Sequence, residues 1–134
     1  METIVFADPV TVTIAALNAG LAGAGQPGVT AYGRVPNPRP SKFVRVLRLG
    51  GPRRDLVTDA AMLTIEAWAD NDPDSAALAQ AARAVVNAME GKVIAGTTVY
   101  TVTEFSGPGN LPDPDTTQSR HTWIVEVATR GLAT

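Results

Sequence analysis

The sequence predicts an α+β fold, in which a mostly antiparallel, mixed sheet of about four or five strands carries two packed helices. Two segments begin at an Asp-Pro pair and continue with apolar residues at helical spacing. The other periodic segments are short, rich in Val, Ile and Thr, and joined by links of hairpin length. The predicted order is α-β-β-β-α-β-β, and residues 1–134 are expected to form a single domain.

The two predicted helices share a start signal. At Asp8-Pro9 the carboxylate can cap the first turn, and proline has the backbone angle that the first helical position needs. Asn71-Asp72-Pro73 repeats this signal before an alanine-rich helix that ends near Gly91. The apolar stripes, at i, i+4, i+7 and i+11, are Val10, Ile14, Leu17 and Leu21 in the first helix and Leu78, Ala82, Val85 and Met89 in the second.

The predicted strands cover residues 29–35, 42–49, 59–69, 97–105 and 121–130. In 121–130, Trp123 shares the apolar face and is expected in the core. In 59–69, Trp68 lies in phase with Thr64 and Glu66 on the more polar face. Two interpretations of Trp68 stay open: a second packing surface such as a subunit interface, where aromatic residues are enriched, or burial under a loop.

Prolines and glycines mark the loops. Residues 36–41, Pro-Asn-Pro-Arg-Pro-Ser, cannot form a helix or a central strand, because proline removes backbone donors. Gly50-Gly51-Pro52 predicts a turn. Residues 106–119 contain Gly, Pro and Asp and no basic residue, so they are expected to form a long acidic loop, and such loops are usually functional.

The strongest single feature is a segregation of charge. Between Arg34 and Arg54 the chain has seven basic residues and no acidic one. The whole chain has a net charge of -2, so the remainder carries -2 - 7 = -9. The basic residues are Arg34, Arg39, Lys42, Arg45, Arg48, Arg53 and Arg54.

This basic segment has three possible meanings: a solvated hairpin, a contact with an acidic protein, or a nucleic-acid platform. A platform for nucleic acid needs aromatic residues between the cations, and only Tyr32 and Phe43 are near. Because the chain also supplies its own acidic loop, we expect one half of a protein–protein contact, with DNA at most passing by.

Composition argues against catalysis. Hydrophobic residues make up 45% and charged residues 18%, as in a globular chain. There is no cysteine and only one histidine, so disulfides, thiolate chemistry and multi-histidine metal sites are excluded within one chain. No cofactor or metal is expected. The start lacks the features of a signal peptide, and no apolar run is long enough to span a membrane, so a soluble intracellular protein is expected.

Individual motifs are better explained by structure than by chemistry. The Gly23-x-Gly25-x-x-Gly28 spacing follows a predicted helix, whereas a dinucleotide site needs it after a strand. His121 has no nucleophile or orienting partner in sequence. Asp113 and Asp115 are too few for a cation loop. The mid-strand Glu66, Glu104 and Glu126 fit a sheet with one wet face, with Arg45 or Arg48 as cross-strand partners, better than a glycosidase pair.

The layout of nearly the whole chain resembles the tail terminator proteins of long-tailed siphophages, the lambda-type minor tail protein U group. A short helix is followed by a proline-broken hairpin, and then by residues 52–69, PRRDLVTDAAMLTIEAWA, a strand preceded by Arg and Asp. An alanine-rich helix over 75–89 comes next. The chain closes on residues 121–131, HTWIVEVATRG, a Trp-containing strand ending in Arg-Gly.

This resemblance implies a structural virion protein with no catalytic residue. Such proteins form a hexameric ring on the head-proximal end of the tail tube, stop tube polymerisation and dock on head-completion (stopper) proteins, while DNA passes through the lumen. The basic segment and the acidic loop are then expected to pair adjacent subunits or successive rings. The expected interface residues are Arg39, Arg45, Arg48, Arg53, Arg54, Trp68, Asp113 and Asp115. Another head-to-tail connector or tail-completion protein, or a small host module that binds nucleic acid, are the alternatives.

Overall fold

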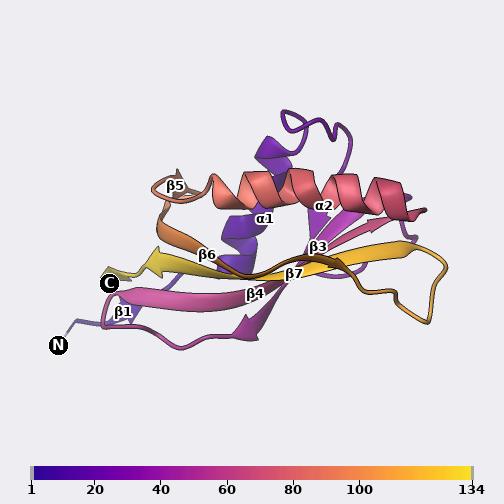
Figure 1. The fold of residues 1–134 in the computed structure, drawn as a ribbon. Coiled ribbons are helices and arrows are strands. Elements are labelled where there is room, and N and C mark those ends of the chain that lie inside the picture. Colours follow the sequence, from indigo (N-terminus) through magenta and orange to yellow (C-terminus); the bar gives the residue numbers. More distant parts are fainter. Residues whose placement is uncertain (1, 134) are drawn as a thin grey trace.

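The computed structural model describes residues 2–133 and has the predicted α+β class (Figure 1). A six-stranded mixed sheet has the order β2-β3-β4-β7-β6-β5, and a two-stranded sheet joins β1 to β8 near the chain ends. The elements are β1 (Ile4–Val5), α1 (Pro9–Gly20), β2 (Ala31–Tyr32), β3 (Phe43–Gly50), β4 (Thr58–Ala69), α2 (Asp72–Asn87), β5 (Val93–Ile94), β6 (Thr97–Asn110), β7 (Ser119–Arg130) and β8 (Leu132–Ala133).

The order of the predicted elements is retained, with three short strands added. β1, β5 and β8 have two residues each, too few for a periodic signal. The strand expected over 29–35 is reduced to Ala31–Tyr32, and β6 extends five residues beyond its expected end at residue 105, to Asn110. The acidic loop is therefore residues 111–118 and is shorter than expected.

Both helices begin at a capping side chain. Asp8 accepts a hydrogen bond from the Val10 amide at 2.9 Å, as predicted. In α2 the cap is Asn71, whose side chain accepts from the Asp74 amide at 2.9 Å. Asp72 is therefore the first helical residue, and its carboxylate accepts from the Ser119 hydroxyl at 2.6 Å. This bond ties the start of α2 to the start of β7.

The basic segment does not form the hairpin expected from its proline pattern. β2 pairs with β3 in parallel, Ala31 opposite Val44 and Tyr32 opposite Arg45. A hairpin requires an antiparallel pair, whereas here the proline-rich link, residues 33–42, carries the chain back to the other end of the sheet before β3 begins. Asn18 of α1 holds β2 in place, since its side-chain oxygen accepts from the Ala31 amide at 2.8 Å.

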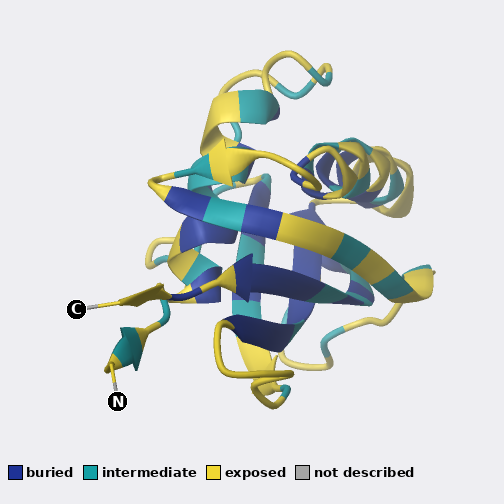
Figure 2. Cartoon of the chain, turned by 90° about the vertical axis from the view of Figure 1, so that its left-hand side faces the viewer, coloured by how far each residue is buried: buried dark blue, intermediate teal, exposed yellow. Residues whose placement is uncertain are grey.

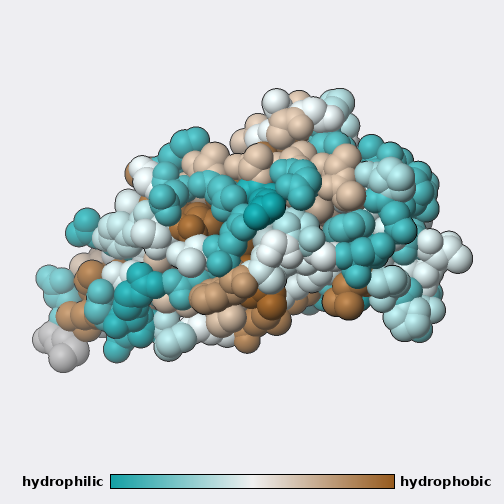
Figure 3. All heavy atoms as spheres, viewed as in Figure 1, coloured by the Kyte–Doolittle hydropathy of each residue, from teal (hydrophilic) through white to brown (hydrophobic). Residues whose placement is uncertain are grey.

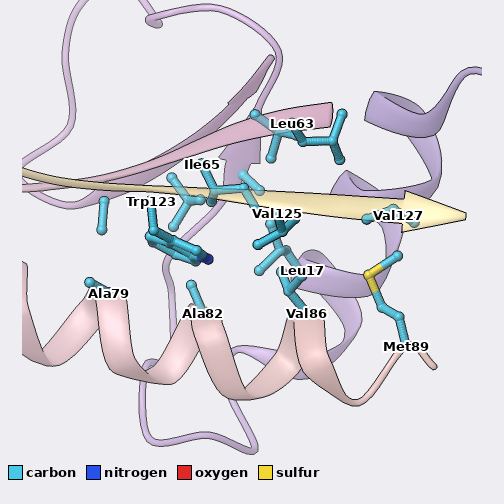
Figure 4. Packing of buried hydrophobic residues seen from close by; sticks show 14 of the residues in the cluster. Leu17, Leu63, Ile65, Ala79, Ala82, Val86, Met89, Trp123, Val125 and Val127 are labelled. Carbon is cyan, nitrogen blue, oxygen red and sulfur yellow. The ribbon is translucent and has the colours of Figure 1, made fainter. Parts of the chain in front are cut away.

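The core lies between one face of the sheet and the two helices. Leu63 and Ile65 of β4 and Val125 and Val127 of β7 point toward α2, and all are fully buried. Trp123 is 1% exposed and lies over the small residues of α2, which confirms its predicted core position (Figure 4). Alanines at Ala79 and Ala82 leave room for this indole, so α2 packs close to the sheet. Figure 2 shows the central strands mostly in dark blue, in line with the nearly continuous burial of β4.

The opposite face of the sheet carries no helix, and it is named the open face below (Figure 1). Its central row on β4 is formed by Thr64, Glu66 and Trp68, out of phase with Leu63 and Ile65. Hydrophobic residues also reach the surface on the lower side of the molecule (Figure 3). The most exposed large side chains beyond the termini include Leu49 at 53%, Phe105 at 56% and Leu111 at 56%.

Glu104 faces α2 instead of the open face, which corrects its expected pairing with Arg45 or Arg48. A register shift in β6 between Val99 and Thr101 changes which residues face the helices. Glu104 therefore meets Arg83, whose Nε and Nη2 each donate to one carboxylate oxygen at 2.7 Å. Asn87 adds a third donor at 2.9 Å.

These hydrogen bonds predict acid sensitivity. They lower the pKa of Glu104 from 4.5 to about 2, with Arg83 as the main cause and Asn87 as the second. Because the folded pKa lies below the unfolded pKa, the stabilisation is complete above pH 4.5 and is lost as the pH falls toward 2. We expect about 1–2 kcal/mol, after discounting for solvent screening at this partly exposed pair. Urea unfolding of the wild type and of Glu104→Gln at several pH values measures this contribution to the free energy of unfolding.

A double-mutant cycle provides the control for this prediction. At pH 7, Arg83→Gln should lower the free energy of unfolding about as much as Glu104→Gln. The double variant should lower it little further, because both substitutions remove the same ion pair. Additive losses, or a pH profile of Glu104→Gln that parallels the wild type, would contradict the assignment.

Candidate assembly surface

Three arginines gather around Glu66 and Trp68, two buried residues of the open face. Glu66 is 7% exposed and accepts from Arg45 Nη1 at 3.4 Å and from Arg120 Nη1 at 3.5 Å. Trp68 Nε1 also donates to Glu66, at 3.4 Å. Arg39 lies over the Trp68 ring at 5.0 Å and Arg120 at 5.2 Å from its centroid. These five residues, named the arginine cluster below, carry three positive charges and one negative charge.

Trp68 is the centre of this cluster and not an exposed contact. It is 1% exposed, and its ring stacks on Phe43 with centroids 5.4 Å apart and an angle of 10° between planes. Arg39 belongs to the proline-rich link that folds over it. Of the two interpretations left open by the sequence, the structure shows burial under a loop. Trp68 supports the surface from beneath and offers no area of its own.

Part of the basic segment is neutralised within the chain. Arg48 forms a bidentate pair with Asp59, with both N–O distances 3.0 Å, and also donates to the carbonyls of Gly50 and Gly51. Arg54 pairs with Glu126 across the open face. The expected cross-strand pairing is thus confirmed for Arg45 with Glu66. Arg48 forms its ion pair with Asp59 instead.

The remaining cations of the segment are free to meet a partner. Within residues 2–133, no acidic group lies at ion-pair distance from Arg34, Arg39, Lys42 or Arg53. Arg34, Arg39 and Arg53 are exposed. The field outside the molecule is therefore weaker than seven uncompensated charges would give.

This division of charges predicts that one charge reversal destabilises the fold and that another leaves its stability nearly unchanged. Arg48→Glu leaves the Asp59 carboxylate, 7% exposed, without its partner and adds a like charge beside it. We expect a loss of about 2–3 kcal/mol in the free energy of unfolding, below that of a fully buried pair because the Arg48 side chain is 34% exposed. Arg53→Glu is the matched control and should stay within about 0.5 kcal/mol. Equal values from chemical denaturation would refute the division.

The acidic loop lies beside the basic segment in the same chain. Gln118 donates to the carbonyl of Pro40 at 3.0 Å, and Arg120 Nε donates to the carbonyl of Leu111 at 2.9 Å. Asp113 accepts from the Asp115 amide at 3.0 Å, so the loop is closed by its own turn. Pro40 and Gln118 are 78 residues apart in the sequence, and the fold brings the two segments together at one end of the molecule.

His121 has a partner that the sequence did not reveal. Its Nδ1 lies 2.6 Å from the Ser75 hydroxyl, which also lies 3.2 Å from the carbonyl of Ala67. Which group donates in this pair depends on the histidine tautomer: if the hydroxyl gives its one proton to Ala67, Nδ1 of His121 must carry a proton and donate. Ser75 is fully buried at the start of α2. The pair joins α2 to β7 and has the geometry of a structural contact.

A groove was also missed from sequence. It has a volume of about 690 Å³ and lies between the C-terminal parts of α1 and α2 and strand β5. Its walls are mainly alanine and glycine, and Lys92 is the charged residue among them. The alanine content of α2 indicated close helix packing, but periodicity cannot show which small residues face a hollow and which face the core.

Residues 2–133 contain neither a membrane-spanning helix nor a cluster of metal-ligating side chains. No helix among residues 2–133 is long and apolar enough to cross a membrane. No group of three or more His, Asp or Glu in these residues is placed to hold a metal ion.

Comparison with known proteins supports the fold. No protein-family model matches the chain, and no curated protein matches its sequence. Among solved structures, a chain of the virion of a native gene transfer agent particle has a similar fold, with a TM-score of 0.67 and 14% sequence identity. The similarity covers 93% of this chain and 100% of the other. This chain therefore has the fold of a component of a phage-like particle over nearly its whole length.

Proposed function

We propose that the chain is a structural protein of a phage-like virion that works as a tail terminator. In this role a hexameric ring of copies caps the head-proximal end of the tail tube, ends tube polymerisation and joins the tail to head-completion proteins. The observation that carries the proposal is the end-to-end match of fold with a gene transfer agent virion chain. The sequence layout, from the first helix to the closing Trp-containing strand, supports the finer assignment.

The surface of the molecule suits assembly. A ring needs two different subunit surfaces and separate faces for its neighbours along the tail. Here the exposed cations Arg39 and Arg53, the exposed carboxylate of Asp115 and the apolar groove lie on different elements. None of them is consumed by the core, so each is available to a partner.

The proposed interface residues divide by role. Arg39, Arg53, Asp113 and Asp115 contribute directly to contacts between copies, successive rings or the tube. Arg54 has both roles, because its side chain pairs with Glu126 and is also 49% exposed. Arg45, Arg48 and Trp68 hold those residues in place, because their side chains already contact Glu66, Asp59 and Phe43. DNA passes through the lumen without a specific site, and the protein resides in the virion after assembly in the host cytoplasm.

Tube capping tests the proposal. The purified protein is mixed with tubes of the tail tube protein from the same particle, and tube length and end structure are recorded by electron microscopy. We expect a ring at one end of each tube and an arrest of elongation. Unchanged elongation without end density would refute the terminator role, and salt-sensitive binding to nucleic acid in its place would favour the host-module alternative.

A further inference from the structure

The groove between α1, α2 and β5 is an apolar site without an occupant from the described chain. Its walls include Ala19 of α1, Ala84 of α2 and Ala88, which caps the C-terminus of α2, with Val93 of β5 at 68% exposure. A Cβ at Gly20 would lie 2.9 Å from Val85 Cγ1, so the helices approach as closely as glycine allows. The volume, about 690 Å³, is within the roughly 300–1,000 Å³ of binding clefts.

The lining of the groove is complementary to an apolar occupant with a negative edge. The helix ends that border it satisfy their own carbonyls, since Gly20 accepts from Ala24 at 3.1 Å and Ala84 accepts from Ala88 at 3.1 Å. No polar group is therefore needed to complete them. Lys92 is the charged lining residue, and no acidic group among residues 2–133 pairs with it.

Leu111 has the matching chemistry. Its side chain is 56% exposed, and Asp113 and Asp115 follow it in the acidic loop. Its backbone is fixed on both sides, because its amide donates to the Arg120 carbonyl at 3.0 Å and its carbonyl accepts from Arg120 Nε at 2.9 Å. A backbone held in this way loses little conformational freedom when the segment binds.

Position separates Leu111 from the exposed apolar residues near the chain ends. Figure 1 shows the acidic loop at one end of the molecule and β5 at the other. Both chain ends lie at the same end as β5. A contact between the two ends of successive copies is head-to-tail, and such a contact closes into a ring when the rotation between copies allows it. Val5 and Leu132, near the chain ends, do not offer this geometry.

We propose that the groove of one copy binds residues 111–115 of the next, with Leu111 between α1 and α2 and the carboxylates of Asp113 and Asp115 facing Lys92. The proposal rests on the proposed self-assembly and names its contact surface. The buried leucine and the charge pair together define the direction of the ring.

Disulfide trapping tests the contact directly, because the natural chain has no cysteine. The single variants Ala88→Cys and Leu111→Cys are mixed and oxidised, both free and on tail tubes. We expect a disulfide-linked dimer of one copy of each. Ala88→Cys mixed with Phe105→Cys is the matched control, since Phe105 is also 56% exposed. A yield no higher than this control, in both settings, overturns the inference.

Affinity gives a second test with a rescue. Leu111→Ser should weaken self-association by about 10- to 100-fold, the loss expected for one buried leucine, with Phe105→Ser as control. Lys92→Asp and the double variant Asp113→Lys/Asp115→Lys should each lose self-association, because groove and loop then carry like charges, and the two variants should associate with each other. Absence of this rescue overturns the charge pair. Tube capping is scored separately, so capping without trapping rejects only the contact, and trapping without capping rejects only the terminator role.

Discussion

Replacing Trp68 by alanine is expected to lower the free energy of unfolding by about 3–5 kcal/mol, although the residue lies outside the main core between sheet and helices. The variant removes the stacked partner of Phe43, 5.4 Å away, and leaves a cavity beneath Arg39 and Arg120. It also removes a donor to Glu66, which is 7% exposed. Urea denaturation, monitored by circular dichroism, measures the loss in the free energy of unfolding.

Phe105→Ala is the matched control for this variant. Phe105 is also aromatic and also on the sheet, but it is 56% exposed, so its removal should change stability by no more than about 0.5 kcal/mol. If Trp68→Ala cost as little as the control, the arginine cluster would not be a packed unit, and the division between supporting and contacting residues would fail.

The second large effect is expected at Gly51, in the turn between β3 and β4. Its φ is +91°, and an added Cβ would lie 2.2 Å from the Ala60 carbonyl oxygen and 2.6 Å from the Met62 nitrogen. Because both neighbours are backbone atoms of a central strand, they cannot move aside. Gly51→Ala should therefore cost about 3–5 kcal/mol, combining backbone strain with a steric clash.

The adjacent glycine separates these two causes. Gly50 also has a positive φ, +135°, but an added Cβ there meets nothing within 4 Å. Gly50→Ala should lower the free energy of unfolding only by the backbone strain, about 1–2 kcal/mol. Thermal or urea unfolding of both variants compares them, and equal losses would show that the close approach to β4 is not the main constraint.

The sequence predicted the elements whose signals are local. Asp8 and Pro9 predicted the start of α1, and the alternation around Leu63 and Ile65 predicted β4 and its two faces. The parallel pairing of β2 with β3 was missed, because prolines define a loop but not the direction in which it returns the chain. The face of Glu104 was also missed, since the register shift after Val99 leaves no mark in the residue pattern.

For the candidate surface, the sequence identified the charged segments but not their partners. Arg48 and Arg53 look alike in a charge count, yet one holds a nearly buried carboxylate and the other is exposed. Strand register alone does not give this difference, because Asp59 lies opposite Arg53 and Arg48 lies opposite Leu63; it depends on how the Arg48 side chain reaches along the turn. The contact between Gln118 and Pro40 depends in turn on the order of strands in the sheet, which no local pattern encodes.

The pairing of β1 with β8 has a practical consequence for imaging. Ile4 lies opposite Ala133 and Val5 opposite Leu132, so both ends of the chain leave the molecule at one corner (Figure 1). A fluorescent or gold-binding fusion added to either end would emerge from that corner, away from the acidic loop. In a ring of such fusions the labels would mark the same position on every subunit, and micrographs of labelled tubes could report which way the ring is oriented.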